Sequence, residues 1–572
     1  MTNNMTLAIK CFFFSLLLIS LAACTDEEQT DPPAPVEPPP EPGETYTPIY
    51  EKFLQGEEIE GGYTLFNWQD TGYKMGEEIP HITGPIFHVN DYGANPNDGQ
   101  DDLIAIQTAI DEAEKAGGGV VLFDAGQYDL NIENDEDFSD EHAIWVRSAN
   151  VVLRGAGREK GNGTVIKQWK KSDNINTVSL HTINFHSNEW SLPGVHTITE
   201  DVAKGSTRIP LNRIVDVTDG AVVGIRMQAW TAETKPEMSE EELYELTNEL
   251  LSPLYDSEDR EEYVQGPSQM PFFFTTQVKE VTDNNEVILA SPIPRALRLK
   301  YRPLLFALKS KVNNCGVEDL LIESIHDGSY IEGGYDTGGI AFTNIDDCWV
   351  NNVAIQDTTL DISLHNSRHI TINDIVVDGA YGHHGIGIYR SDNNLIQNLH
   401  YKTYRNHVVT LTGTSSGNVV RNLNNTSDSD LLGIDFHGGF ASYNLLENLR
   451  NVTLQSSGGW GSNAHSGQYN VVWNLVRSAL TGRGDNEAYT YCSYSSYSYD
   501  GPYDTWADCY RQHPKTIFVG MTHITPGELV NIKKSPDDII NEWRYVEGLN
   551  NPDVQPRSLY EAQRTNKSMV GQ

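Results

Sequence analysis

Apolar and polar positions repeat in a fixed order along the second half of the chain. One or two apolar residues are followed by a variable residue, an Asn or Asp, and a further apolar residue, as in Val419-Val420-Arg421-Asn422-Leu423. Seven copies occur, at intervals of 22 to 33 residues. Their last apolar residues are Leu320, Val353, Ile375, Leu399, Leu423, Leu449 and Leu475. Repeats of this length predict a solenoid, in which each copy is one turn that stacks on the next.

The copies contain short runs of strand-forming residues, so the expected fold class is all-β, a right-handed parallel β-helix. A leucine-rich repeat of similar period would need an L-x-x-L-x-L skeleton, which is absent. A second Asn stands four residues before the Asn/Asp position in the last four copies, at Asn394, Asn418, Asn444 and Asn470. Stacked Asn side chains can hydrogen-bond from turn to turn, so we expect Asn422 and its equivalents to form an inward ladder.

The first third of the chain fits the closed end of such a solenoid. Two Asp residues at 101–102 can cap a short helix over 103–110 that is apolar on one face. The motifs around this helix are Val89-Asn90-Asp91-Tyr92-Gly93, Gly117-Gly118-Gly119-Val120-Val121 and Gly126-Gln127-Tyr128. Their order resembles the N-terminal cap of the pectate-lyase superfamily, which includes polygalacturonases and phage tailspikes. The resemblance implies a carbohydrate-active β-helix with a short N-terminal capping helix, but no particular reaction.

Changes of composition divide the chain into six parts. We expect a lipoprotein signal peptide at 1–23, a Pro/Glu-rich tether at 24–48, the N-terminal cap and first turns at 49–195, a small inserted β subdomain with an acidic helical excursion at 196–303, the main repeats at 304–515 and a C-terminal cap at 516–572. The insert either walls a substrate cleft or only decorates the solenoid.

The N-terminus carries a targeting signal. Lys10 precedes an apolar run at 12–21 that is too short to span a bilayer, and the run ends in Leu21-Ala22-Ala23-Cys24. This ending resembles the bacterial lipoprotein signal, which implies a lipid on Cys24. An ordinary signal peptide cleaved at the small residues is the alternative. We therefore expect an exported outer-membrane lipoprotein that faces the cell surface and touches the membrane only through its anchor.

Four cysteines remain beyond the signal, at Cys315, Cys348, Cys492 and Cys509. An even number in an exported protein favours disulfides. Spacing does not determine the pairing, and Cys492 with Cys509, which would close a Tyr/Ser-rich loop, is the first choice. No C-x-x-C spacing suggests zinc. We expect no cofactor and no metal, and nothing in the sequence supports a calcium ion.

The formal net charge of -40 excludes one class of partner, because such a chain repels nucleic acid. A β-helix offers a long groove along one sheet, which suits a linear polymer. We therefore expect a monomer whose partner is a polysaccharide.

Histidines gather where the repeats are most regular. Eight of the 17 lie between His365 and His465. His384 and His407 each open an alternating run and are 23 residues apart, about one repeat. Adjacent turns of a parallel solenoid are about 4.8 Å apart, so these two imidazoles should be neighbours. Tyr389 on the first run and Asp435 on the following turn complete the predicted catalytic set.

This set suits proton removal from a uronate. Histidine titrates near working pH and can take the proton beside a carboxyl group, tyrosine can protonate the leaving oxygen, and arginine can neutralise the carboxylate. The residues predicted to bind substrate are His365, Arg390, Lys402, Arg405, His437 and Trp460. The hypothesis is an extracellular polysaccharide lyase that acts by β-elimination.

Two alternatives stay open. A glycoside hydrolase needs two carboxylates about 5–10 Å apart, and Asp435 with Asp430 or Asp361 could supply them. A non-catalytic glycan-binding solenoid would use its aromatic residues as platforms. Histidines that only stack between turns would fit this second alternative.

Overall fold

The computed structural model describes residues 45–132, 139–172, 181–188, 195–227, 235–251, 272–329, 335–427, 432–455, 467–477, 492–493, 515–529 and 544–570. Cys24 and the predicted signal peptide lie outside the described residues. Within the described part of the chain, no helix is both long and apolar enough to cross a bilayer.

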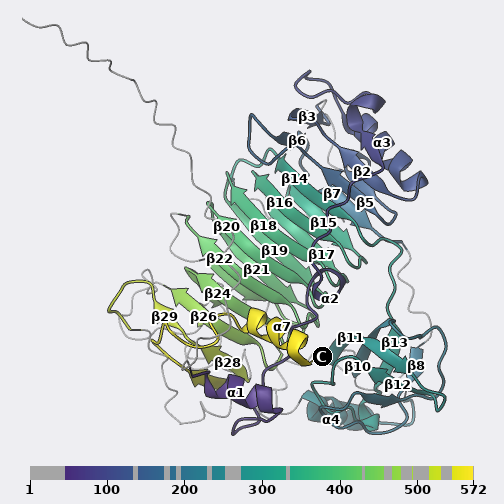
Figure 1. Ribbon diagram of the computed structural model, residues 1–572, viewed down its shortest axis with the longest axis vertical. Coiled ribbons are helices and arrows are strands. Elements are labelled where there is room, and N and C mark those ends of the chain that lie inside the picture. The colour runs from purple at the N-terminus through teal and green to yellow at the C-terminus, as the bar shows by residue number, and fades with distance from the viewer. Residues whose placement is uncertain are drawn as a thin grey trace, which may run out of the picture. The chain divides into compact units, whose positions relative to one another are not determined.

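Two long parallel sheets form the body of the protein (Figure 1). Over the described residues, the first sheet has 15 strands. They are β1 (Ile86–His88), β2 (Gly119–Leu122), β3 (Gly126–Leu130), β5 (Val151–Arg154), β6 (Thr164–Gln168), β14 (Gly316–Glu323), β16 (Trp349–Gln356), β18 (Thr371–Asp378), β20 (Leu395–Tyr401), β22 (Val419–Asn425), β24 (Leu445–Arg450), β26 (Val471–Arg477), β28 (Thr516–Val519), β29 (Thr522–His523) and β30 (Arg544–Glu547).

The second sheet has nine strands. They are β4 (Ile144–Val146), β7 (His181–His186), β15 (Gly338–Thr343), β17 (Leu360–His365), β19 (Gly382–Tyr389), β21 (Arg405–Thr412), β23 (Leu432–Phe436), β25 (Val452–Gln455) and β27 (Cys492–Ser493). From β14 to β28, successive strands of the chain alternate between the two sheets, and each pairs in parallel with the strand one turn away. The predicted parallel β-helix is confirmed.

The recurring Asn/Asp position has a backbone reason that the sequence did not reveal. In all seven copies this residue has a left-handed conformation, with φ between 52° and 58°. Asn and Asp adopt this conformation more readily than other residues with a side chain. The side chains also stack as expected, since Asn422 Nδ2 donates to Asn398 Oδ1 at 3.0 Å. Asn422 is only half-buried, however, so this ladder is not the inward one.

The inward ladder consists of the Asn residues four positions earlier. Asn394 Nδ2 donates to Asn418 Oδ1 at 2.9 Å, and Asn418 Nδ2 donates to Asn444 Oδ1 at 2.9 Å. The contact continues from Asn444 to Asn470 at 3.0 Å. These side chains are fully buried or nearly so, and their amides also donate to backbone carbonyls. The ladder therefore satisfies polar groups inside the core.

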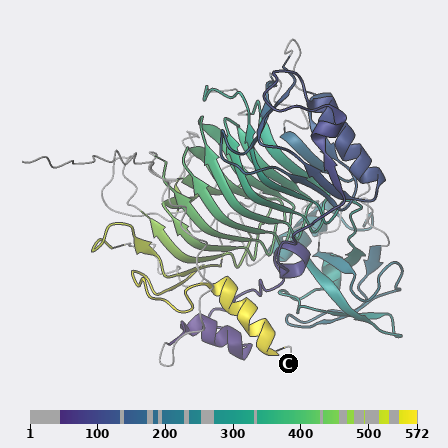
Figure 2. The same ribbon diagram turned by 45° about the horizontal axis from the view of Figure 1, so that its top comes forward.

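The helix α3 (Leu103–Lys115) closes the N-terminal end of the strand stack, as Figures 1 and 2 show. Leu103, Ile106 and Ile110 are buried, as the amphipathic pattern predicts. Asp101 Oδ1 accepts a hydrogen bond from the Leu103 amide at 3.0 Å. Asp102 instead accepts bonds from the amides of Asn95 in a loop and Asp129 in β3, so it fixes the approach to the helix.

The insert is a separate six-stranded antiparallel sheet, which confirms the predicted β subdomain. Its strands are β8 (Val195–Thr197), β9 (Arg208–Pro210), β10 (Val222–Met227), β11 (Phe272–Val281), β12 (Glu286–Leu289) and β13 (Leu304–Ala307), and it carries the helix α4 (Glu240–Leu251). Asn393 Nδ2 donates to the Thr275 carbonyl at 3.1 Å, and Ser416 Oγ donates to the Phe273 carbonyl at 3.1 Å. These bonds tie the insert to the turns that follow β19 and β21.

Short helices cover the outer face of the first sheet. They are α1 (Pro48–Gln55), α2 (Tyr73–Gly76) and α7 (Leu559–Val570), and 3-10 turns occur at Val89–Tyr92, Asp140–His142 and Leu299–Tyr301. Tyr560 of α7 and Tyr50 of α1 pack in one buried cluster with Trp473 of β26. The buried Glu447 carboxylate of β24 accepts a bond from the Tyr560 amide at 2.9 Å, which fixes the start of α7.

The expectation of disulfides is wrong for one pair of cysteines. Cys315 and Cys348 are free thiols buried in the core. They precede β14 and β16 at aligned positions of consecutive turns, so their side chains point the same way, and Cβ vectors that do not converge disfavour a bridge. The predicted pair of Cys492 and Cys509 falls outside the described side chains.

Candidate active site

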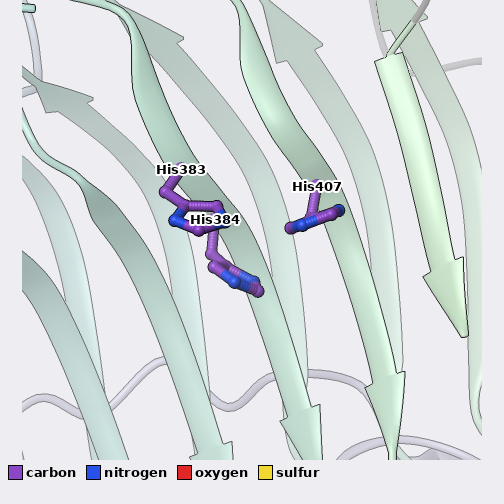
Figure 3. A group of neighbouring side chains, drawn as sticks. All are labelled: His383, His384 and His407. Atoms are coloured by element: carbon purple, nitrogen blue, oxygen red, sulfur yellow. The ribbon is translucent and has the colours of Figure 1, made fainter. Parts of the chain in front are cut away.

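A backbone irregularity brings two consecutive histidines to the same face of β19. The amides of His383 and His384 both donate to the Thr359 carbonyl, at 3.1 and 2.9 Å. In a regular strand consecutive side chains point to opposite faces, whereas a bulge of this kind redirects one of them. The two ring centroids are therefore 4.5 Å apart (Figure 3).

His407 lies beside them on the next turn, as the one-repeat spacing predicts. His384 of β19 pairs with His407 of β21, and the ring centroids are 4.8 Å apart. The His383 ring is also 5.1 Å from the His407 ring. Figure 3 shows all three rings gathered between the two neighbouring strands. We refer to His383, His384 and His407 as the histidine cluster.

Both ring nitrogens of His384 have fixed partners. Nδ1 lies 2.8 Å from Thr410 Oγ1, and Nε2 lies 2.9 Å from the Tyr335 hydroxyl. The Tyr335 ring stacks on His383, with centroids 5.1 Å apart and planes 12° apart. Tyr335 is therefore a hydroxyl donor held directly against the histidine cluster.

A buried carboxylate holds the other side of the cluster. Asp435 of β23 has a fully buried side chain, and its Oδ2 lies 2.7 Å from His437 Nδ1 and 3.5 Å from His407 Nδ1. The Asn406 amide nitrogen lies 2.9 Å from His407 Nε2. The His437 side chain is 41% exposed, so it presents an imidazole to solvent while Asp435 holds it from below.

These surroundings shift the pKa values of the imidazoles in opposite directions, so that some favour the neutral form and one favours the protonated form. Burial and the neighbouring His407 lower the pKa of His383 to about 4, and the same causes hold the pKa of His384 well below its usual value. The hydrogen bond that His437 donates to the Asp435 carboxylate raises the pKa of His437. Burial also raises the pKa of the Tyr335 hydroxyl to about 12, so that this group keeps its proton at neutral pH.

Tyr389 and His365 extend the site along the same face. They pair on neighbouring strands and their rings stack, with centroids 4.5 Å apart. The Tyr389 ring folds back over Gly387, where a Cβ would come within 2.3 Å of ring atom Cε2 and 2.7 Å of the hydroxyl oxygen. Burial raises the pKa of Tyr389, and interactions with Tyr335 and Asp435 raise it further, so the Tyr389 hydroxyl shares the electrostatic environment of the site.

The other residues predicted to bind substrate lie outside the histidine cluster. Arg390 is exposed at the end of β19, and Lys402 lies in the turn between β20 and β21. The expectation that Arg405 binds substrate is wrong, because its side chain is fully buried in an ion pair with Asp361. Trp460 and Asp430 fall outside the described residues.

Three residues of the site were missed in the sequence. Tyr335 precedes β15 and belongs to no copy of the repeat, although it lies 49 residues before His384, about two turns. His383 would face away from His384 in a regular strand. Thr410 lies in the same alternating run as His407, three residues on, and that run was the one available signal.

No family model matches the chain. Segments of it are similar to curated proteins of Azotobacter vinelandii: 35% identity over 111 residues to the mannuronan C5-epimerase AlgE3, 42% over 81 residues to alginate lyase 7, and 42% over 138 residues to the mannuronan C5-epimerase AlgE5. The matches cover 19%, 14% and 24% of this chain, and 6%, 9% and 13% of those proteins. The chain thus spans a small part of the length of these relatives.

Solved structures with a similar course include the A-module of the Azotobacter vinelandii mannuronan C-5 epimerase AlgE4 and the tailspike protein gp49 of Pseudomonas phage LKA1. The first has a TM-score of 0.33 and 14% identity over 81% of this chain and 96% of its own. The second has a TM-score of 0.31 and 12% identity over 71% of this chain and 83% of its own. Superpositions with scores of this size do not bear on the chemistry of the site.

Proposed function

We propose that this chain acts on a polysaccharide that contains uronic acid, and that it removes the hydrogen at C5, next to the carboxyl group. The favoured outcome is β-elimination, which makes the protein a polysaccharide lyase. The observation that carries the proposal is the Tyr335 hydroxyl, 2.9 Å from His384 Nε2 with its ring stacked on His383. The protonated Tyr335 hydroxyl and the neutral imidazoles then lie side by side. General acid–base catalysis needs such a pair, a proton donor next to a proton acceptor.

His383 is the base in this proposal. It is partly exposed, whereas His384 and His407 are buried. In the elimination, the C5 proton passes to His383 and the C5–H electron pair forms a double bond between C4 and C5. The bond from C4 to the glycosidic oxygen breaks, and that oxygen takes the proton of the Tyr335 hydroxyl. His384 orients Tyr335, and Thr410 orients His384.

The carboxylate of the substrate needs a positive partner, because its charge opposes the formation of a carbanion beside it. His437 can supply this charge, since Asp435 favours its protonated form. Arg390 lies exposed at the end of β19, on the strand that carries His383, and is a second cation available to a bound polymer. His437 and Arg390 would thus give a polyanionic substrate two positive charges to bind, although the chain as a whole is strongly acidic.

The second candidate is C5 epimerisation of a uronate polymer, and the epimerase relatives favour it. Lyase and epimerase begin with the same loss of the C5 hydrogen. An epimerase then returns a proton to the opposite face of C5 and leaves the glycosidic bond intact. The Tyr335 hydroxyl would serve either reaction, as the acid for the leaving oxygen or for C5.

The glycoside hydrolase alternative has less support. Asp361 is fully buried in its ion pair with Arg405, so it cannot flank a glycosidic bond. Asp435 is also fully buried and accepts a bond from His437. Two accessible carboxylates are therefore lacking among the described candidates for this chemistry.

A product assay on alginate rich in mannuronate, with pectate, ulvan and glycosaminoglycans as further substrates, tests the proposal. A lyase yields new reducing ends together with the ultraviolet absorbance of unsaturated uronates. An epimerase yields neither, but changes the C5 configuration seen by NMR, and a hydrolase yields reducing ends alone. Tyr335→Phe should lower either uronate activity about 10²-fold or more. A parent that gives reducing ends without absorbance would contradict the proposal, and one that changes no polymer would favour a binding protein.

A further inference from the structure

The histidine cluster has the composition and spacing of a metal-binding site. One ligand nitrogen from each of His383, His384 and His407 can be chosen so that all three lie within 4.8 Å of one another. The bulge at Thr359 and the parallel register of β19 and β21 fix these positions through the backbone. Figure 3 shows the His383 and His384 rings together on one strand and the His407 ring on the neighbouring strand.

Groups outside the cluster orient the rings in the way that metal-ligating histidines require. Such histidines usually hold one ring nitrogen against a carboxylate, a carbonyl or a hydroxyl, which leaves the other to face the ion. His384 Nδ1 lies 2.8 Å from Thr410 Oγ1, and His407 Nδ1 lies 3.5 Å from the buried Asp435 carboxylate. Both Nε2 atoms are thereby directed away from these supports. The second contact is the arrangement in which a carboxylate increases the basicity of a ligating imidazole.

We propose that His383, His384 and His407 bind one divalent transition-metal ion of the zinc class. Three imidazoles suit zinc, cobalt, nickel or copper, whereas calcium and magnesium prefer oxygen ligands.

The rings need only a small closing movement to accept the ion. Zinc–nitrogen distances of 2.0–2.1 Å in a tetrahedral site place ligand nitrogens about 3.3 Å apart. The widest separation of 4.8 Å therefore has to shorten by about 1.5 Å, within reach of side-chain rotation. The ion replaces the contacts of His384 Nε2 with Tyr335 and of His407 Nε2 with Asn406. The Tyr335 hydroxyl then lies beside the position where a fourth ligand would bind.

A bound ion would occupy a nitrogen of His383, so metal binding and proton removal by His383 are alternative uses of the same ring. The test of the metal site therefore measures binding and not turnover. The full-length protein is stripped with a chelator, and Zn²⁺ and Co²⁺ are titrated separately by calorimetry. Visible absorbance reports the coordination of bound Co²⁺. We expect saturable binding of one ion per chain, with an intense tetrahedral cobalt spectrum, and no competition from a large excess of Ca²⁺.

Two variants and one control assign the binding to the cluster. His383→Ala removes a partly exposed ligand and should weaken Zn²⁺ binding about 10-fold or more. Thr410→Val removes the support of His384 and should weaken it about 10-fold, which keeps the test valid if His383→Ala folds poorly. His365→Ala, a half-buried histidine on the same face, should bind Zn²⁺ like the parent. Absence of one-to-one binding, or equal affinity in the parent and in every folded cluster variant, would overturn the proposal.

Discussion

The Arg405 guanidinium and the Asp361 carboxylate form an ion pair that is closed to solvent next to the histidine cluster. Arg405 Nη2 and Nε donate to Asp361 at 3.0 and 3.1 Å, and both side chains are 0% exposed. Arg405 pairs with Gly382, the residue before His383, and a Cβ at Gly382 would lie 2.8 Å from the guanidinium carbon. The pair therefore supports the strand starts from which the cluster projects.

Removal of one partner of this ion pair should be far more harmful than removal of both. Asp361→Leu leaves a buried guanidinium without its counter-charge, and we expect the free energy of unfolding to fall by about 3–5 kcal/mol. The double variant Asp361→Leu/Arg405→Met should recover most of that loss. Urea denaturation of the parent and both variants measures the difference. A single variant within about 1 kcal/mol of the parent would mean that the pair contributes little to the fold.

Because the backbone at Asn422 is left-handed, we expect a Gly variant at this position to be more stable than an Ala variant. Ala at φ 53° is strained, whereas Gly is not, and both lose the contact with Asn398. Asn422→Ala should therefore be less stable than Asn422→Gly by about 1 kcal/mol. Asn424, an exposed residue of the same strand, is the matched control, because Gly should be the worse substitution there. The same order at both positions, measured by urea denaturation, would argue against the backbone explanation.

Two glycines of β19 should separate activity from stability. Ala at Gly387 would push the Tyr389 ring away, so we expect near-parental stability but about 10-fold or more loss of turnover. Ala at Gly385 would come within 2.3 Å of the Tyr401 hydroxyl and the Val408 carbonyl oxygen, inside the core. Gly385→Ala should therefore lower the free energy of unfolding by about 1–3 kcal/mol. Parental turnover in Gly387→Ala would remove Tyr389 from the site.

Buried histidines outside the cluster should make the protein less stable in mild acid. Burial lowers the pKa of His181 to about 3 and that of His365 to about 4, and the neighbouring Arg390 adds to the shift of His365. Between about pH 6.5 and these values, the unfolded chain binds protons that the folded chain does not. Stability should thus fall as the pH drops through this window and be unaffected by these groups above it.

Urea denaturation midpoints at pH 7.5 and 4.5 measure this dependence. Carboxyl groups also titrate in the window, so His365→Gln is the comparison that isolates one imidazole. The variant should lose less stability than the parent between the two pH values. Equal losses in parent and variant would show that His365 is not held neutral by its surroundings.

The features that depend on the spacing of the repeats could be predicted from the sequence. Those that depend on an irregularity of the backbone could not. The spacing of the repeats was enough to bring His384 next to His407. It could not place His383 on the same face, because the bulge arises from two amides that share the Thr359 carbonyl. Tyr335 was missed because it precedes its strand, where the chain follows no repeat.

Burial was the other quantity that the sequence did not give. Arg405 was expected to bind substrate, yet it is buried against Asp361, which lies 44 residues earlier in the chain. The Asn/Asp position was explained by side-chain stacking, which does occur, although the left-handed backbone is the stronger reason for the residue type.

Release of the C5 hydrogen tests the central claim most directly. A uronate polymer labelled with deuterium at C5 is incubated with the protein, and NMR follows the deuterium that appears in water, whether the outcome is elimination or epimerisation. We expect release by the parent, about 10²-fold slower release by His383→Gln, and a parental rate in His400→Gln, which changes a histidine of the first sheet. A parent that cleaves a polymer without this release, or a His383→Gln variant with the parental rate, would contradict the account.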